Sequence, residues 1–288
     1  MKIVDEIRKD ISKSISYLPL LLLFPLTLSA QPSKKLILLQ TSDVHSRVEP
    51  VNQEGDRDYD EGGMVRRATF LKEFRKENPG DILLFDCGDI SQGTPYYNMF
   101  RGEVEVKMMN EMKYDAMTIG NHEFDFDLPN MARLFKMADF PVVCSNYDFD
   151  ATELKGLVKP YVVLKKGGLK IGVLGLGCRL EGMVQANKCE GVVFKDPIAT
   201  ANEVAAVLKE KEGCDLVICL SHLGVQYDTD RLIPHVRNID VVLGGHSHTF
   251  MKGPKTYLDK DGKNVSLMHC GARGVNVGRM DLTLEKKK

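Results

Sequence analysis

Leu36-Ile37-Leu38-Leu39-Gln40 runs directly into Thr41-Ser42-Asp43-Val44-His45, so a short apolar segment ends in a polar one. An uninterrupted apolar run of this length predicts a strand buried on both faces, as in a parallel sheet covered by helices. The carboxyl ends of such strands are where α/β proteins bind ligands. The stretch therefore predicts an α/β fold, with Asp43 and His45 at its ligand-binding edge.

The same succession of apolar strand and polar cluster occurs four more times. Ile82–Phe85 leads into Asp86-Cys87-Gly88-Asp89, Ala116–Ile119 into Gly120-Asn121-His122-Glu123-Phe124-Asp125, Leu216–Leu220 into Ser221-His222, and Val241–Leu243 into Gly244-Gly245-His246-Ser247-His248. Five of the 7 histidines therefore follow predicted strands. Histidines used for core packing or for the surface would be scattered over helices and loops as well. The pattern predicts one functional site at the strand ends.

Predicted helices alternate with these strands. In Met64–Glu77 the residues Val65, Leu71 and Phe74 are spaced as one apolar helix face. Further helices are expected at Glu103–Met112, Leu128–Met137 and Ala199–Lys211. No internal repeat or Pro/Ser-rich linker divides the chain, so we expect a single α/β domain.

Two pairs of strands are expected to form hairpins. Lys166-Gly167-Gly168 joins Tyr161–Leu164 to Leu169–Leu174 and supplies the residues of a tight turn. Near the end of the chain, Ser266–His269 and Met280–Leu284 are expected to form a second, hairpin-like pair.

Composition excludes several classes of protein. The 288 residues are 43% hydrophobic and 27% charged, which suits a globular domain with a sizeable core. Lys and Arg number 39 against 40 Asp and Glu, so no basic surplus indicates a partner that is a nucleic acid polymer. Seven cysteines are too few for a disulfide scaffold. Most are expected as buried thiols, and Cys178 and Cys189 are the best candidates for a bridge.

The first 30 residues differ from the rest. Tyr17–Leu28 is an apolar run of 12 residues that ends at Ser29-Ala30, shorter than the roughly 20 residues of a membrane-spanning helix. Its length and its small-residue exit predict a signal peptide over residues 1–30, with a retained signal anchor as the alternative. We therefore expect an exported protein, periplasmic or extracellular, without a stable membrane anchor, whose mature domain comprises residues 31–288.

The residue types at the strand ends indicate metal chemistry. Imidazole, carboxylate and amide groups offer the nitrogen and oxygen donors that suit Mn, Fe, Co, Ni or Zn. In extended backbone, residues i and i+2 point to the same side, so Asp43 with His45, and His246 with His248, would each aim two donors into one cavity. A carboxylate such as that of Asp89 can bridge two cations about 3.5–4 Å apart.

Together these motifs resemble the calcineurin-type metallophosphoesterase family, and in particular its 5′-nucleotidase branch. The branch is indicated by Gly88-Asp89-Ile90-Ser91-Gln92-Gly93-Thr94, Gly62-Gly63-Met64-Val65-Arg66, Gly271-Ala272-Arg273-Gly274 and Gly278-Arg279-Met280-Asp281-Leu282. The resemblance extends from Leu36 to Leu284. It implies a four-layer α/β/β/α sandwich in a single catalytic domain.

The resemblance also implies two divalent metal ions, of unresolved identity among Mn, Zn, Fe, Co and Ni. The first would be held by Asp43, His45 and His248, the second by Asn121, His222 and His246, and Asp89 would bridge them. A water activated by the metals would attack the phosphoester. His122, oriented by Asp125, would stabilise the transition state or act as a general acid.

The implied function is that of an exported dinuclear-metal phosphohydrolase that cleaves nucleotide phosphomonoesters. Three alternatives stay open: a 2′,3′-cyclic phosphodiesterase with 3′-nucleotidase activity, a nucleotide-sugar hydrolase, and a non-catalytic binding subunit. Enzymes of this branch usually carry a C-terminal domain that binds the nucleoside. Because this sequence ends at Lys288, we expect that a separate polypeptide could supply that domain.

Other polar residues are expected to have structural roles. These are Glu123, which should stabilise its loop, the histidines His235 and His269, and Asp86, which should point away from the site.

Overall fold

The computed structural model describes residues 34–284, so the predicted signal peptide lies outside the described residues. The described residues belong to one compact unit. Among the described residues, none of the helices combines the length and the apolar character needed to cross a membrane.

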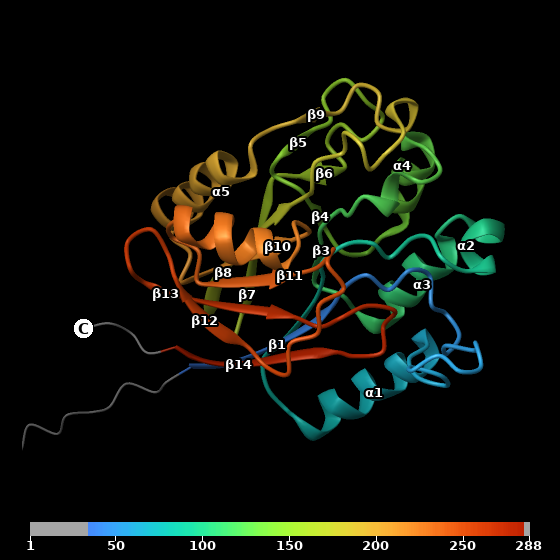
Figure 1. Ribbon diagram of the computed structural model, residues 1–288. Coiled ribbons are helices and arrows are strands. Elements are labelled where there is room, and N and C mark those ends of the chain that lie inside the picture. Colours follow the sequence, from blue (N-terminus) through green and yellow to red (C-terminus); the bar gives the residue numbers. More distant parts are fainter. Residues whose placement is uncertain (1–33, 285–288) are drawn as a thin grey trace, which may run out of the picture. The chain divides into compact units, whose positions relative to one another are not determined.

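Two six-stranded sheets lie face to face in this unit (Figure 1). The first has the order β14 (Gly278–Leu284), β1 (Lys34–Thr41), β2 (Ile82–Asp86), β3 (Ala116–Met117), β4 (Val142–Val143) and β6 (Val158–Lys159). The second has the order β12 (Lys255–Leu258), β13 (Asn264–His269), β11 (Val241–Gly244), β10 (Leu216–Ser221), β8 (Leu169–Leu176) and β7 (Tyr161–Lys166). A small separate sheet pairs β5 (Tyr147–Asp148) with β9 (Val193–Phe194). The strands that carry the predicted site, β1–β3 and β10–β11, run parallel within their sheets.

Helices cover the outer face of each sheet (Figure 1). Those beside the first sheet are α1 (Met64–Glu77), α2 (Pro95–Phe100), α3 (Glu103–Met112) and α4 (Leu128–Met137). Those beside the second are α5 (Pro197–Ala206), continued by a π turn (Val207–Lys211), and α6 (Val225–Tyr227), continued by the turns Asp228–Leu232 and Ile233–His235. Two short 3₁₀ turns, His122–Phe124 and Ala186–Lys188, lie in loops.

Alternation along the strands produces three apolar layers. On β1, Leu38 packs between the two sheets, whereas its neighbour Leu39 packs among the helices of the first sheet. On β10, Ile218 packs between the sheets and Val217 among the helices of the second. Because both faces of these strands are buried, their sequences read as continuous apolar runs. The predicted four-layer α/β/β/α sandwich is confirmed.

The expected closing hairpin is wrong. β14 pairs antiparallel with β1 in the first sheet, whereas β13 lies in the second sheet between β11 and β12. The hairpin partner of β13 is β12, which the sequence did not indicate because its side chains are mostly exposed. The other predicted hairpin, β7 with β8, is confirmed.

Two smaller expectations also need correction. On α1, Val65 is 65% exposed, and Arg67 instead takes a buried position between Met64 and Leu71. All seven cysteines are free, including Cys178 and Cys189, so that candidate bridge is absent.

Candidate metal centre

Seven of the nine predicted site residues come together where β1, β2, β3, β10 and β11 end. Their donor atoms form three overlapping groups, each with all its donor atoms within 4.8 Å of one another. The groups are Asp43–His45–His248, His45–Asp89–His122 and Asp89–His222–His246. Since His45 and Asp89 each belong to two groups, the donors form one continuous cluster.

We call Asp43–His45–His248 the open group, because the His248 side chain is 51% exposed. The Nε2 atoms of His45 and His248 lie 2.9 Å apart, and Nε2 of His248 lies 3.5 Å from Oδ1 of Asp43. The Asp43 carboxylate is fully buried and accepts hydrogen bonds from the Ser42 hydroxyl and, at 3.0 Å, from the backbone N–H of His246.

We call Asp89–His222–His246 the closed group, because none of its residues is exposed. Nδ1 of His222 lies 2.6 Å from the carbonyl oxygen of Cys87, an arrangement in which this nitrogen donates and Nε2 is directed into the cluster. Nε2 is buried without a hydrogen-bond partner among the described residues, although Oδ2 of Asp89 lies 3.1 Å away. A buried imidazole nitrogen left unpartnered beside a carboxylate is the arrangement that a divalent cation would complete.

The backbone that presents these donors is left-handed, not extended. Asp43, His45, Asp89, His246 and His248 all have φ between 50° and 73°. Asp43 and His45 converge in one group as predicted, whereas His246 and His248 belong to different groups. The reason given for convergence, the alternation of an extended strand, is wrong. Hydrogen bonds hold the first two loops together instead, from the N–H of Asp43 to Gly88 (2.9 Å) and from that of His45 to Asp89 (3.0 Å).

Close packing makes glycine necessary at two positions in the loops. A Cβ at Gly120 would lie 2.1 Å from Oδ1 of Asp89 and 2.7 Å from Nε2 of His222. A Cβ at Gly245 would lie 2.1 Å from the Ser42 hydroxyl. Any larger residue would therefore displace the donors themselves.

Asn121 is buried directly before the turn that carries His122. Its Oδ1 lies 3.7 Å from the sulfur of Cys178. The position at the strand end agrees with the expectation, and the role of Asn121 as a ligand stays a prediction.

His122 and Asp125 have the predicted geometry. Nδ1 of His122 lies 2.9 Å from Oδ2 of Asp125, and this hydrogen bond raises the pKa of His122 against the opposing effect of burial. The backbone N–H of His122 donates to Oδ1 of Asp89 at 2.8 Å, and its ring lies edge-on to that of His45, with the centroids 5.3 Å apart. His122 is about one-third exposed, so its ring stands between the donor cluster and solvent.

Glu123 stabilises its loop, as expected. Its buried carboxylate accepts from the backbone N–H groups of Asp89 (2.9 Å), Ile90 (2.9 Å), Ser91 (3.2 Å) and Gly120 (2.6 Å). These bonds join the loop after β2 to the loop after β3.

The two remaining histidines, His269 and His235, make hydrogen bonds outside the donor cluster. His269 is buried, with Nε2 2.9 Å from Asp228, whose other oxygen accepts from Ser221 at 2.6 Å. His235 is exposed, and its Nδ1 lies 2.7 Å from the carbonyl of Arg231.

The sequence did not indicate the contacts made by Ser42 and Cys87. Because Ser42 is adjacent to Asp43 in the sequence, its contact with the Asp43 carboxylate could have been predicted. The carbonyl of Cys87 carries no signal of residue type, because every residue has one.

Comparisons with known proteins agree with this geometry. The family model for calcineurin-like phosphoesterases matches residues 36–250. A snake venom 5′-nucleotidase of Crotalus adamanteus is 34% identical over 90% of this chain and 47% of its own length. The solved structure of a 5′-nucleotidase precursor from Thermus thermophilus has 32% identity and a TM-score of 0.81 over 87% of this chain and 52% of its own. A Haemophilus influenzae NAD nucleotidase has 28% identity and a TM-score of 0.77, over 88% of this chain and 48% of its own.

The chain thus spans about half the length of the curated relatives it matches. The matched region contains the strand ends that carry the donor cluster, from Asp43 to His248. On these grounds the chain belongs to the calcineurin-like phosphoesterase family.

Proposed function

We propose that the chain hydrolyses the phosphomonoesters of nucleotides, with two divalent cations held in the open and closed groups and bridged by Asp89. The observation that carries this proposal is the unpartnered Nε2 of His222 beside the Asp89 carboxylate. Asn121 would complete the closed group. The resemblance to 5′-nucleotidases supports the choice of substrate.

When bound, the two cations would supply an activated water and positive charge for the phosphate. The residues of the chain would do the rest. His122 is tied to Asp125 through Nδ1, which leaves Nε2 free to donate a proton to the phosphate or to the leaving oxygen. Beside His246 and Ser247 a pocket of about 710 Å³, lined also by Tyr227 and Arg231, offers room for the organic part of a substrate.

A second candidate is hydrolysis of a nucleotide that carries a larger group on its phosphate, as in nucleotide sugars. The similarity to an NAD nucleotidase favours this alternative over a cyclic nucleotide.

We also propose that the protein is exported, with cleavage after Ala30. The apolar run Tyr17–Leu28 and its small-residue exit support this. N-terminal sequencing of the protein recovered from the producing cells tests it: a chain that begins at Met1 or Lys2 would contradict cleavage.

The proposed activity is tested with the purified chain, stripped by a chelator and resupplied with Mn²⁺, Co²⁺ or Zn²⁺. The substrates are AMP, 3′-AMP, cyclic 2′,3′-AMP, UDP-glucose, NAD and an aryl phosphate. We expect metal-dependent release of phosphate from AMP. Cleavage of UDP-glucose or NAD with AMP left intact would favour the second candidate. Hydrolysis of the aryl phosphate alone would indicate that nucleoside recognition needs another polypeptide, and no metal-dependent hydrolysis at all would contradict the proposal.

A further inference from the structure

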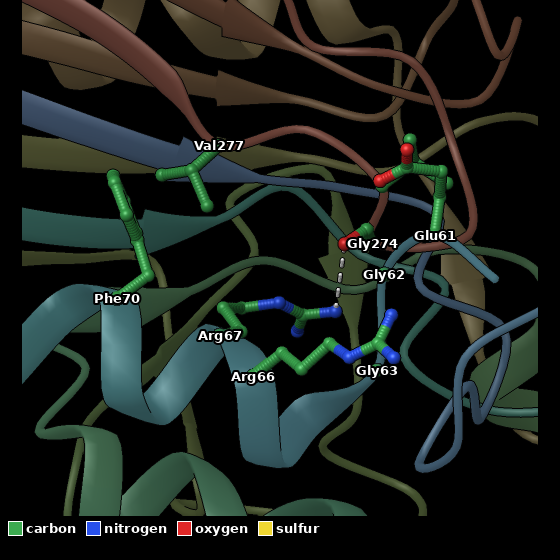
Figure 2. Close-up of a pocket in the computed structure, with 9 residues that line it drawn as sticks. Glu61, Gly62, Gly63, Arg66, Arg67, Phe70, Gly274 and Val277 are labelled. Carbon is green, nitrogen blue, oxygen red and sulfur yellow. Dashed lines mark hydrogen bonds between the residues drawn. The ribbon is translucent and has the colours of Figure 1, made fainter.

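A buried arginine lies on α1, facing the loop that contains Gly274. Arg67 is 4% exposed on the inner face of α1, and its Nε and Nη1 are buried without hydrogen-bond partners among the described residues. Figure 2 shows its side chain reaching from α1 to the carbonyl of Gly274, a contact of 3.5 Å. A guanidinium this poorly solvated needs a negative charge nearby.

The charge of Arg67 acts on the buried carboxyl group of Asp86, at the end of β2. Asp86 is fully buried, and burial raises its pKa to about 7, while hydrogen bonds from Thr41 and Gly88 and the charge of Arg67 oppose that rise. Thr41 lies 2.6 Å from Oδ2 of Asp86, and the hydroxyl of Tyr114 lies 2.8 Å from that of Thr41.

The direction of these hydrogen bonds follows from the number of protons. An arginine can only donate, and a threonine hydroxyl has one proton. Since Thr41 donates to Asp86, Tyr114 must donate to Thr41. The positive charge of Arg67 lies beside Tyr114 and lowers the pKa of that phenol against the effect of burial. The hydroxyls of Tyr114 and Thr41 thus form one oriented chain that ends at the Asp86 carboxylate.

The carboxylate end of this chain reaches the loop that carries the bridging residue. Oδ1 of Asp86 accepts from the backbone N–H of Gly88 at 2.9 Å, and Gly88 directly precedes Asp89. Thr41 itself lies two residues before Asp43, and its carbonyl accepts a hydrogen bond from the backbone N–H of Cys87 at 3.0 Å. The chain therefore joins the ends of β1 and β2 at the point where both become left-handed loops.

We propose that Tyr114, Thr41 and Asp86 are positioning residues, which fix the turn at Gly88 and so set the affinity of Asp89 for a divalent cation. The metal part of this inference rests on the proposed function. A rigid carboxylate binds a cation more tightly because fewer conformations are lost on binding.

The test compares two buried tyrosines. Tyr114→Phe removes one link of the chain, whereas Tyr97→Phe removes a buried hydroxyl that has no partner among the described residues. With Tyr114→Phe we expect Mn²⁺ affinity, measured by calorimetry, to fall by about tenfold or more, and the amide resonance of Gly88 to shift in the metal-free protein. Tyr97→Phe should change neither.

A second pair of variants, both at Thr41, separates the loss of the hydrogen bond from a general loss of packing. Thr41→Ser keeps the hydroxyl and should retain metal affinity, whereas Thr41→Val keeps the shape and should weaken it as Tyr114→Phe does. Unchanged Mn²⁺ affinity in both Tyr114→Phe and Thr41→Val, with circular dichroism showing folded protein, would overturn the inference. The calorimetry and the amide shift need no substrate, so their outcome is distinct from failure of the proposed hydrolase activity.

Discussion

The closed and open groups of the metal centre each contain a histidine beside a carboxylate, but the two histidines are held very differently. His222 is fully buried and its Nδ1 is fixed by the carbonyl of Cys87. His248 is 51% exposed, and its Nε2 lies 3.5 Å from Asp43, against 3.1 Å for the pair His222–Asp89. A fixed donor loses little conformational entropy on binding. The comparison therefore predicts that the closed group binds its cation more tightly and releases it more slowly.

The largest effect is expected where the two groups join. Asp89→Asn replaces the carboxylate that we propose bridges them, so it should weaken both sites at once. Several kcal/mol of charge stabilisation would be lost, so hydrolysis should fall by at least about 10⁴-fold. Elemental analysis should show fewer metal ions per chain. Normal metal content with normal turnover would contradict the bridging role.

The second-largest effect is expected at His122, which lies beside both groups but is not assigned to either as a ligand. His122→Ala should lower turnover by about 10²- to 10³-fold, because it removes a proton donor. Metal content should stay near that of the unmodified chain. His235→Ala, at an exposed histidine outside the centre, is the matched control and should change neither quantity. Turnover equal to that of the control would contradict the role of His122.

The strand ends that form these groups could be predicted from sequence because parallel strands bring their carboxyl ends to one edge. Asp43, Asp89 and His222 lie far apart along the chain, yet each follows an apolar run. The left-handed loops could not be predicted, because the residues concerned are not glycine and nothing in their type demands a positive φ. The loops are shaped by long-range backbone hydrogen bonds, which leave no pattern in the sequence.

Arg67 shows a second limit of sequence reasoning. Helical spacing predicted that Val65 lies on the inner face of α1, because apolar residues that recur at this spacing are assigned to the buried face of a helix. The structure instead buries Arg67, whose guanidinium contacts the carbonyl of Gly274, far along the chain. A polar residue in a core position becomes intelligible only when the groups around it are known.

The two groups should also differ in how much their histidines, His222 and His248, contribute to the free energy of unfolding of the metal-free protein. His222→Ala leaves the buried Asp89 carboxylate without its partner and should lower the free energy of unfolding by about 3–5 kcal/mol. His248→Ala, at an exposed side chain, should change it by less than about 0.5 kcal/mol. Urea unfolding of the chelated variants measures both. Equal destabilisation would show that the two groups are held alike.

The smallest effect that we expect is a pH dependence caused by the protonation of His222. Burial alone would lower the pKa of His222, but the negative charge of Asp89 raises it to about 10, and the pKa of Asp89 is lowered in turn. We therefore expect the closed group of the metal-free chain to be an imidazolium–carboxylate pair at pH 7. The raised pKa of His222 contributes stability that is complete below about pH 6.5 and is lost as the pH rises towards 10. By contrast, burial lowers the pKa of His45 and of His246.

A cation that enters the closed group must displace the proton of His222, because only the neutral imidazole binds metal. Metal affinity should therefore rise by about tenfold per pH unit between pH 7 and 9. Calorimetry in two buffers of different ionisation enthalpy should show release of about one proton per chain. In His222→Ala this release should disappear, whereas in His248→Ala it should remain. A metal affinity independent of pH over this range would mean that the pair His222–Asp89 is already unprotonated, and the difference between the groups would then be one of exposure alone.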